Sequence, residues 1–92
     1  MENTIFYLEY CPYCKRAKAL LQHAVCENPQ LKVAFDSFEW VEESRESEKA
    51  EAFDYYYVPA YYIDSVKKHE GIVTYDKALE LLNIAKSAME NA

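Results

Sequence analysis

Residues 6–21 read FYLEYCPYCKRAKALL and place Cys11 and Cys14 where an apolar run gives way to a helical pattern. The preceding run, TIFYL at residues 4–8, is rich in β-branched and aromatic side chains, which is typical of a strand buried on both faces. From Pro12 the apolar residues recur with helical spacing, and a helix should end before Pro29. The apolar stripe of this helix is Ala17, Leu20, Leu21, Ala24 and Val25.

Two further elements are predicted in the middle of the chain. Leu31, Val33 and Phe35 alternate with Lys32, Ala34 and Asp36, which predicts an edge strand over residues 31–38. Residues 40–53 have high helix propensity but a thin apolar stripe, which favours a short, solvated helix. The charged run from Glu42 to Asp54 is interpreted as the exposed face of that helix.

The last third of the chain predicts a hairpin and a helix. Residues 58–64 and 69–73 read as two strands joined by a polar turn at residues 65–68, and Pro59 is tolerated at the start of the first strand. Thr74 is a favourable N-cap for a helix over residues 75–89. The inward stripe of that helix is Ala78, Leu81, Leu82 and Ala85.

The predicted order is βαβαββα, in a single domain covering residues 1–92. The first β-α-β unit needs a parallel crossover, and the later hairpin adds antiparallel strands. A mixed four-stranded sheet ordered 2-1-3-4, with three helices on its two faces, accommodates both connections. We therefore predict an α/β protein. Cys11 should lie just beyond the carboxyl end of a central strand, where α/β folds present reactive groups.

Composition excludes several classes of partner. Ten Lys and Arg residues against sixteen Asp and Glu leave a net charge of −6, so the sequence has no basic footprint for nucleic acid or anionic membranes. The amino-terminal apolar stretch is too short for the apolar core of a signal peptide or for a membrane span. Three cysteines are too few for a small secreted protein held together by disulfides. We therefore expect a cytoplasmic protein whose cysteines do chemistry.

The spacing of the two thiols suggests what that chemistry is. If Cys11 is the N-cap of the helix, its sulfur faces the free N–H groups of the first turn and the positive end of the helix dipole, which favours thiolate over thiol. Pro12 then takes the first helical position, where its missing N–H costs nothing. Cys14 lies one turn along the same face, within disulfide reach and on the buried stripe. We expect Cys11 to attack a substrate disulfide and Cys14 to resolve the mixed disulfide.

A zinc site is the main alternative that the residues themselves raise. Cys11, Cys14, His23 and Cys26 form a C-x2-C-x8-H-x2-C string. If residues 12–26 are one helix, Cys14 and His23 are about 13.5 Å apart along its axis, whereas ligands of one zinc lie within ~4 Å of each other. We expect no metal at this string.

The sequence as a whole resembles a glutaredoxin of the thioredoxin superfamily, through CPYC at residues 11–14, KRAKALL at 15–21 and YVPAYYID at 57–64. The resemblance covers nearly the whole chain and implies a thioredoxin-like fold. It also implies that Pro59 is cis and faces the redox pair, that the backbone of Val58 pairs with the substrate's cysteine, and that Tyr13 lines the substrate groove. The expected substrate-binding residues are Tyr10, Pro12, Tyr13, Tyr57, Val58 and Pro59.

Three positions depart from the pattern of that family. Dithiol glutaredoxins usually carry a lysine three residues before the first cysteine, a threonine before Val-Pro and a Gly-Gly pair after the last strand, all of which help hold glutathione. Here these places are Leu8, Tyr57 and the HEG segment of residues 69–71. We expect weak glutathione binding unless Lys15, Arg16, Lys67 or Lys68 compensates.

These features predict a glutaredoxin-type thiol–disulfide oxidoreductase that uses a Cys11–Cys14 couple to reduce protein or glutathione mixed disulfides. No cofactor should be bound tightly, glutathione is the expected co-substrate, and we expect a monomer that acts on disulfide-containing proteins. Two alternatives stay open: a thioredoxin-like reductant recharged by a reductase protein, and a module that binds an iron–sulfur cluster.

Overall fold

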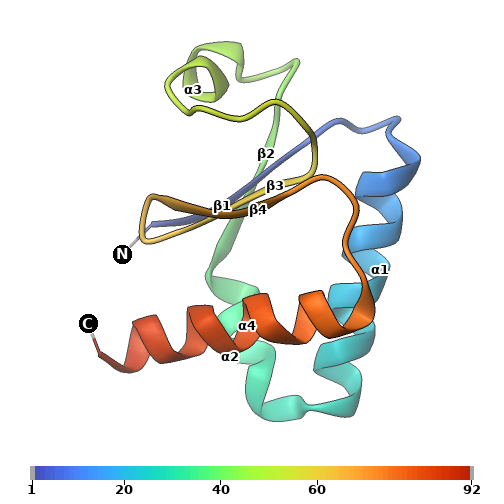
Figure 1. Cartoon of the computed structure of the whole chain (residues 1–92), viewed down its shortest axis with the longest axis vertical. Helices are drawn as coiled ribbons and strands as arrows, with labels where there is room; N and C mark the ends of the chain where they lie inside the picture. Colours follow the sequence, from blue (N-terminus) through green and yellow to red (C-terminus); the bar gives the residue numbers. More distant parts are fainter. Residues whose placement is uncertain (1, 92) are drawn as a thin grey trace.

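The computed structural model describes residues 2–91 and contains a four-stranded sheet with helices on both faces (Figure 1). The strand order β2-β1-β3-β4 confirms the predicted 2-1-3-4 sheet, with β1 parallel to β2 and antiparallel to β3. The α/β architecture is therefore the expected one. The elements are β1 (Asn3–Tyr7), α1 (Pro12–Glu27), the 3₁₀ turn η1 (Pro29–Leu31), α2 (Lys32–Ser37), β2 (Phe38–Glu42), α3 (Ser47–Glu51), β3 (Ala60–Ile63), β4 (Val66–Glu70) and α4 (Tyr75–Glu90).

The two long helices agree with the sequence predictions. α1 begins at Pro12 and ends at Glu27, before Pro29, and its buried residues belong to the predicted stripe. The N-cap of α4 is Thr74, whose hydroxyl oxygen accepts a hydrogen bond from the backbone N–H of Lys77 at 3.2 Å. All four residues predicted to point inward from α4 are buried. Helices of four turns repeat their pattern often enough for periodicity to define them.

The predicted strand over residues 31–38 and helix over residues 40–53 are wrong. Residues 29–37 form η1 and α2, and the second strand is β2, which takes the first residues of the predicted helix. Leu31 and Ala34 are buried three residues apart, as on one face of a helix, whereas Val33 is exposed. In this segment the chain therefore follows the spacing of a helix and not the alternation of a strand. The fold has one helix, α2, in addition to the three predicted. Only α3 remains of the predicted second helix.

The predicted hairpin forms, but its turn and second strand lie earlier than expected. β4 covers Val66–Glu70 rather than residues 69–73, and Ile63 pairs directly with Val66. Asp64 and Ser65 make a two-residue turn in which both residues have positive φ, 52° and 64°. Such turns match the right-handed twist of paired strands, and Asp tolerates the conformation. β4 lies at the edge of the sheet, where Lys67 and Lys68 are exposed.

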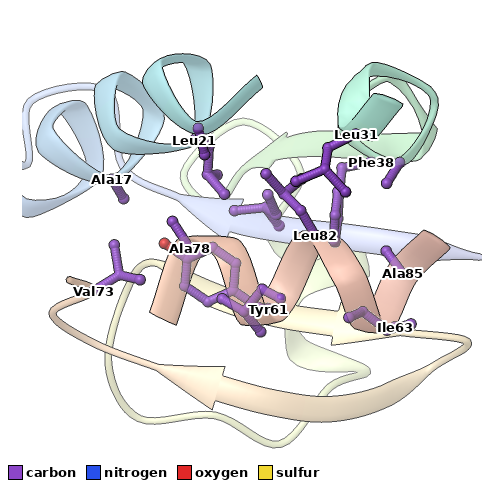
Figure 2. Packing of buried hydrophobic residues seen from close by; sticks show 14 residues of the cluster. Ala17, Leu21, Leu31, Phe38, Tyr61, Ile63, Val73, Ala78, Leu82 and Ala85 are labelled. Carbon is purple, nitrogen blue, oxygen red and sulfur yellow. The ribbon is translucent and has the colours of Figure 1, made fainter. Parts of the chain in front are cut away.

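The sheet separates two layers of apolar side chains. Ile5 and Phe6, adjacent on β1, are fully buried on opposite faces, as expected for a strand covered on both sides. α1, α2 and α4 cover one face, and α3 covers the other (Figure 1). Figure 2 shows the larger layer, in which Leu21, Leu31 and Leu82 from the helices meet Tyr61 and Ile63 from β3.

Candidate active site

Cys11 lies at the N-cap of α1, as the sequence predicts. Its backbone is extended, with φ −80° and ψ 119°, and Pro12 follows at the start of the helix. The Cys11 amide donates to the Leu8 carbonyl at 3.1 Å, and its own carbonyl accepts from the Lys15 amide at 3.2 Å. Within residues 2–91 the Cys11 thiol makes no capping hydrogen bond, so the expected contact between sulfur and first-turn amides is not present. The side chain is partly exposed.

Cys14 lies one turn deeper and is a different kind of thiol. Only 3% of its surface is exposed, and burial raises its pKa to about 12. The adjacent Cys11 and the more distant carboxylate of Glu43 raise that pKa as well, while a backbone hydrogen bond with Leu8 opposes them. Desolvation disfavours the thiolate, so Cys14 is held as a neutral thiol next to a solvent-accessible one.

The Val58–Pro59 peptide bond is cis, as the resemblance implied. Pro59 is buried directly before β3, and its carbonyl accepts from the Gly71 amide at 2.8 Å. The antiparallel register pairs Ala60 with Phe6, so Pro59 lies at the end of the sheet where β1 runs into the Cys11 loop. The proline loop and the two thiols thus lie at the same edge.

The tyrosines expected around the thiols are exposed. Tyr10 is 86% exposed, and Tyr13, at the start of α1, is 54% exposed. Tyr57, before the cis proline, is 69% exposed, and its neighbour Tyr56, which was not among the expected residues, is 81% exposed. Exposed aromatic rings near a reactive group are characteristic of contact surfaces for a ligand or a polypeptide.

A cavity of about 520 Å³ opens beside Cys11. Its lining brings together part of the predicted site, Tyr10 and Cys11, with residues from the end of β2 that the sequence did not indicate. The residues from the proline loop, Tyr57, Val58 and Pro59, are not part of this lining. The cavity is lined by Leu8, Glu9, Tyr10, Cys11, Glu42, Ser44 and Arg45.

Glu42 is the site residue that the sequence interpretation missed most clearly. It is 6% exposed at the end of β2 rather than on a solvated helix. Its carboxylate accepts from the Glu9 amide at 3.1 Å, from the Ser44 amide at 2.6 Å and from the Ser44 hydroxyl at 2.6 Å. The hydroxyl of Ser44 and the amide of Glu9 hold the pKa of Glu42 below its usual value. An ionised Glu42 therefore ties the loop before Cys11 to the β2–α3 turn.

A family model of thioredoxin domains matches residues 1–83, most of the chain. The chain belongs to the thioredoxin-domain family. Comparison with curated proteins found no match, and comparison with solved structures found none either. The family is that of thiol–disulfide oxidoreductases, and the two neighbouring thiols at the start of α1 agree with a redox function.

The cavity of this thioredoxin domain contains a cation, Arg45, which the sequence interpretation assigned to an exposed helix face. Arg45 lines the cavity beside Cys11 and donates to the Glu9 carboxylate at 2.5 Å. Of the four cations expected to compensate for Leu8, Lys67 is paired with Glu70. Lys15, Arg16 and Lys68 are exposed but do not line this cavity.

The zinc-like string is dispersed along α1 of this thioredoxin domain. Cys14 is buried, Cys26 is exposed, and His23 pairs with Glu27 at 3.0 Å. Among residues 2–91, no three His, Cys, Asp or Glu side chains gather as a metal site. In the same part of the chain, no helix has the length and apolar character needed to cross a membrane.

Proposed function

We propose that this thioredoxin domain is a glutaredoxin-type thiol–disulfide oxidoreductase, with Cys11 as nucleophile and Cys14 as resolving thiol. The observation that carries the proposal is the asymmetry of the two thiols, one partly exposed at a helix N-cap and one buried beneath it with a raised pKa. A solvent-accessible thiol at the positive end of a helix dipole is suited to attack, and a buried thiol is protected until a mixed disulfide forms beside it.

The proposed cycle balances as two exchanges. The Cys11 thiolate attacks one sulfur of a substrate disulfide, so that one substrate thiolate leaves and a Cys11–substrate disulfide forms. Cys14 then loses its proton and attacks the Cys11 sulfur, which releases the second substrate thiolate and leaves the Cys11–Cys14 disulfide. The substrate has gained two electrons from the protein. Two molecules of glutathione then reduce the Cys11–Cys14 disulfide and are themselves oxidised to glutathione disulfide. No tightly bound cofactor takes part.

The substrate side of the site follows from the surfaces around Cys11. Tyr10, Pro12 and Tyr13 surround the nucleophile on the loop and the first turn of α1. Tyr57, Val58 and Pro59 border the same end of the sheet and supply a backbone edge for a substrate segment. We propose disulfide-containing polypeptides and glutathione as partners, and a monomer in the cytoplasm that uses neither nucleic acid nor a membrane.

Arg45 supports a route for glutathione despite Leu8. A guanidinium is well suited to a carboxylate, and Arg45 lies in the cavity beside Cys11. In the free protein, however, it is engaged by Glu9, so a glutathione carboxylate has to compete with that ion pair. Binding should be weak for this reason, without saturation at low millimolar glutathione.

The test is a coupled assay in which glutathione and a thioredoxin-reductase system are compared as donors for the wild type, Cys11→Ser and Cys14→Ser. We expect turnover with glutathione, no activity in Cys11→Ser, and retained activity of Cys14→Ser on glutathionylated substrates, where glutathione itself resolves the adduct. Leu8→Lys should lower the half-saturating glutathione concentration by roughly tenfold, because it restores one charge-assisted contact.

Two outcomes would contradict this proposal. Full activity of Cys11→Ser would remove the assignment of the nucleophile. Reduction of the wild type by the reductase protein alone would favour the thioredoxin-like alternative, in which the acidic surroundings of Cys11 exclude glutathione.

A further inference from the structure

Glu70, the last residue of β4, joins the hairpin to the loop that precedes the cis proline. One carboxylate oxygen, Oε2, accepts from the backbone amides of Tyr56 at 2.7 Å and Tyr57 at 3.0 Å. The other, Oε1, accepts from Lys67 Nζ at 2.9 Å. One side chain thus binds two consecutive amides and a cation, and Lys67 together with those amides lowers its pKa to about 2. Glu70 is therefore ionised throughout the neutral range.

A second contact supports the same loop from the same place. The amide of Gly71, next to Glu70, donates to the Pro59 carbonyl at 2.8 Å. Gly71 has φ +86°, a conformation that other residues rarely adopt, and the Cβ of Tyr57 lies 3.7 Å from where a Gly71 Cβ would be. The end of β4 therefore fixes the loop at both of its ends, at Tyr56–Tyr57 and at Pro59.

The side chains of this loop do little to fix it themselves. The rings of Tyr56 and Tyr57 are mostly exposed, so neither packs into a core. The position of the Tyr56–Tyr57 backbone depends on the Glu70 carboxylate, because both amides donate their hydrogen bonds to it. The same backbone leads directly into Val58.

We propose that Glu70 is a positioning residue for this site, whose carboxylate holds the Tyr56–Val58 backbone where it meets a substrate bonded to Cys11. The inference rests on the proposed function and deepens it. A positioning role for Glu70 should affect two classes of substrate differently. A glutathionylated or disulfide-bonded polypeptide has to dock on the loop, whereas a small disulfide needs only access to Cys11.

The chain offers a matched control for Glu70. Lys77 and Glu80 on α4 form an ion pair with the same i,i+3 spacing and the same Nζ–O distance of 2.9 Å, and Glu80 binds no part of the loop. Glu70→Ala should raise KM for a glutathionylated peptide by about 5- to 10-fold with little change in kcat, as expected for the loss of hydrogen bonds to a charged group. Glu80→Ala should behave as the wild type.

Two further arms test whether the effect comes from the loop. Glu70→Gln keeps a carbonyl oxygen for the two amides and should recover most of the wild-type KM. The single-turnover rate of reduced Glu70→Ala with 2,2′-dipyridyl disulfide should stay within about 2-fold of wild type, because that probe does not dock on the loop. An unchanged KM in Glu70→Ala, or an equal loss of rate with the small disulfide, overturns the assignment.

Amide hydrogen exchange distinguishes failure of this inference from failure of the proposed function. The Tyr56 and Tyr57 amides should exchange faster in Glu70→Ala than in wild type or Glu80→Ala. If exchange is unchanged in an active enzyme, the role of Glu70 is wrong and the function stands. If exchange accelerates but the wild type reduces no disulfide, the function is wrong and Glu70 is only a structural support.

Discussion

The two faces of the sheet are built in different ways. One is covered by α1, α2 and α4, whose largely aliphatic side chains interlock with β1 and β3 (Figures 1 and 2). The other is covered by α3, a helix of five residues, over an aromatic cluster. In that cluster the ring of Phe6 stacks on Tyr55 at 5.1 Å and meets Tyr62 edge-on at 5.6 Å.

The difference shows which parts of the structure depend on their neighbours. Four-turn helices with an apolar stripe bury a continuous surface, whereas a five-residue helix is too short to be stable by itself. The α3 layer is held by aromatic contacts and polar links, including the hydrogen bond from the Tyr55 hydroxyl to the Glu43 carboxylate at 3.0 Å. The face covered by α3 is therefore the less autonomous of the two.

The largest expected effect is the loss of folding stability when a core residue is truncated, and it can be compared between the two faces. Leu82→Ala removes a fully buried side chain from the helical layer and should lower the free energy of unfolding by about 2–5 kcal/mol. Phe53→Ala, at a partly buried position in the aromatic cluster, should cost roughly half as much. Urea unfolding monitored by circular dichroism measures both.

An exposed apolar residue provides the control for that pair. Val33→Ala on α2 should change the free energy of unfolding by less than about 0.5 kcal/mol, because its side chain is half exposed. A loss in Phe53→Ala as large as in Leu82→Ala would mean that the α3 layer is as tightly packed as the helical one.

A smaller effect, of opposite sign on the two faces, is expected from Tyr61 and Tyr62. Tyr62 donates to the Asp54 carbonyl at 2.8 Å, so Tyr62→Phe should lower the free energy of unfolding by about 1 kcal/mol. The Tyr61 hydroxyl is fully buried and has no partner among residues 2–91, so Tyr61→Phe should raise that free energy by up to ~1 kcal/mol. Thermal unfolding of the two variants shows the signs, and destabilisation by Tyr61→Phe would indicate that its hydroxyl is satisfied.

The smallest expected effect is local and depends on pH. The pKa of Glu42 is lowered in the folded protein, so its contribution is present above about pH 4.5 and is lost as pH falls through its folded pKa. Amides of Glu9 and Ser44, which bind Glu42, should lose exchange protection on acidification before amides of α1 and α4 do. Glu42→Gln, neutral at every pH, should remove this pH dependence, whereas simultaneous loss in α1 and α4 would show that the two faces unfold as one unit.

The sequence predicted the two long helices well for a physical reason. α1 and α4 repeat their apolar spacing over four turns, and Pro12 and Thr74 define their starts by backbone chemistry. Because Pro12 marks the start of α1, Cys11 could be placed at its N-cap and Cys14 in its first turn. The cis bond before Pro59 was implied by the resemblance to glutaredoxins and has no signature in the periodicity.

The middle of the chain, residues 31–53, was mispredicted because its elements, η1, α2, β2 and α3, are short. Over residues 31–38 the sequence satisfies both the alternation of a strand and the spacing of a helix, and so short a segment does not decide between them. Glu42 and Glu70 were missed for another reason. Their long-range partners are backbone amides of Glu9, Tyr56 and Tyr57, and a contact with a distant backbone leaves no mark in the pattern of side chains.

The exposed edge of the sheet has a consequence for how this protein behaves in concentrated solution. An edge strand offers unpaired N–H and C=O groups to any other strand, and a second copy pairing along β4 would extend the sheet between molecules. Consecutive lysines, Lys67 and Lys68, stand on that strand, and antiparallel pairing of two copies would bring their positive charges together. Repulsion between these lysines, along with the register irregularity between Tyr61 and Tyr62 in the pairing with β4, opposes edge-to-edge aggregation.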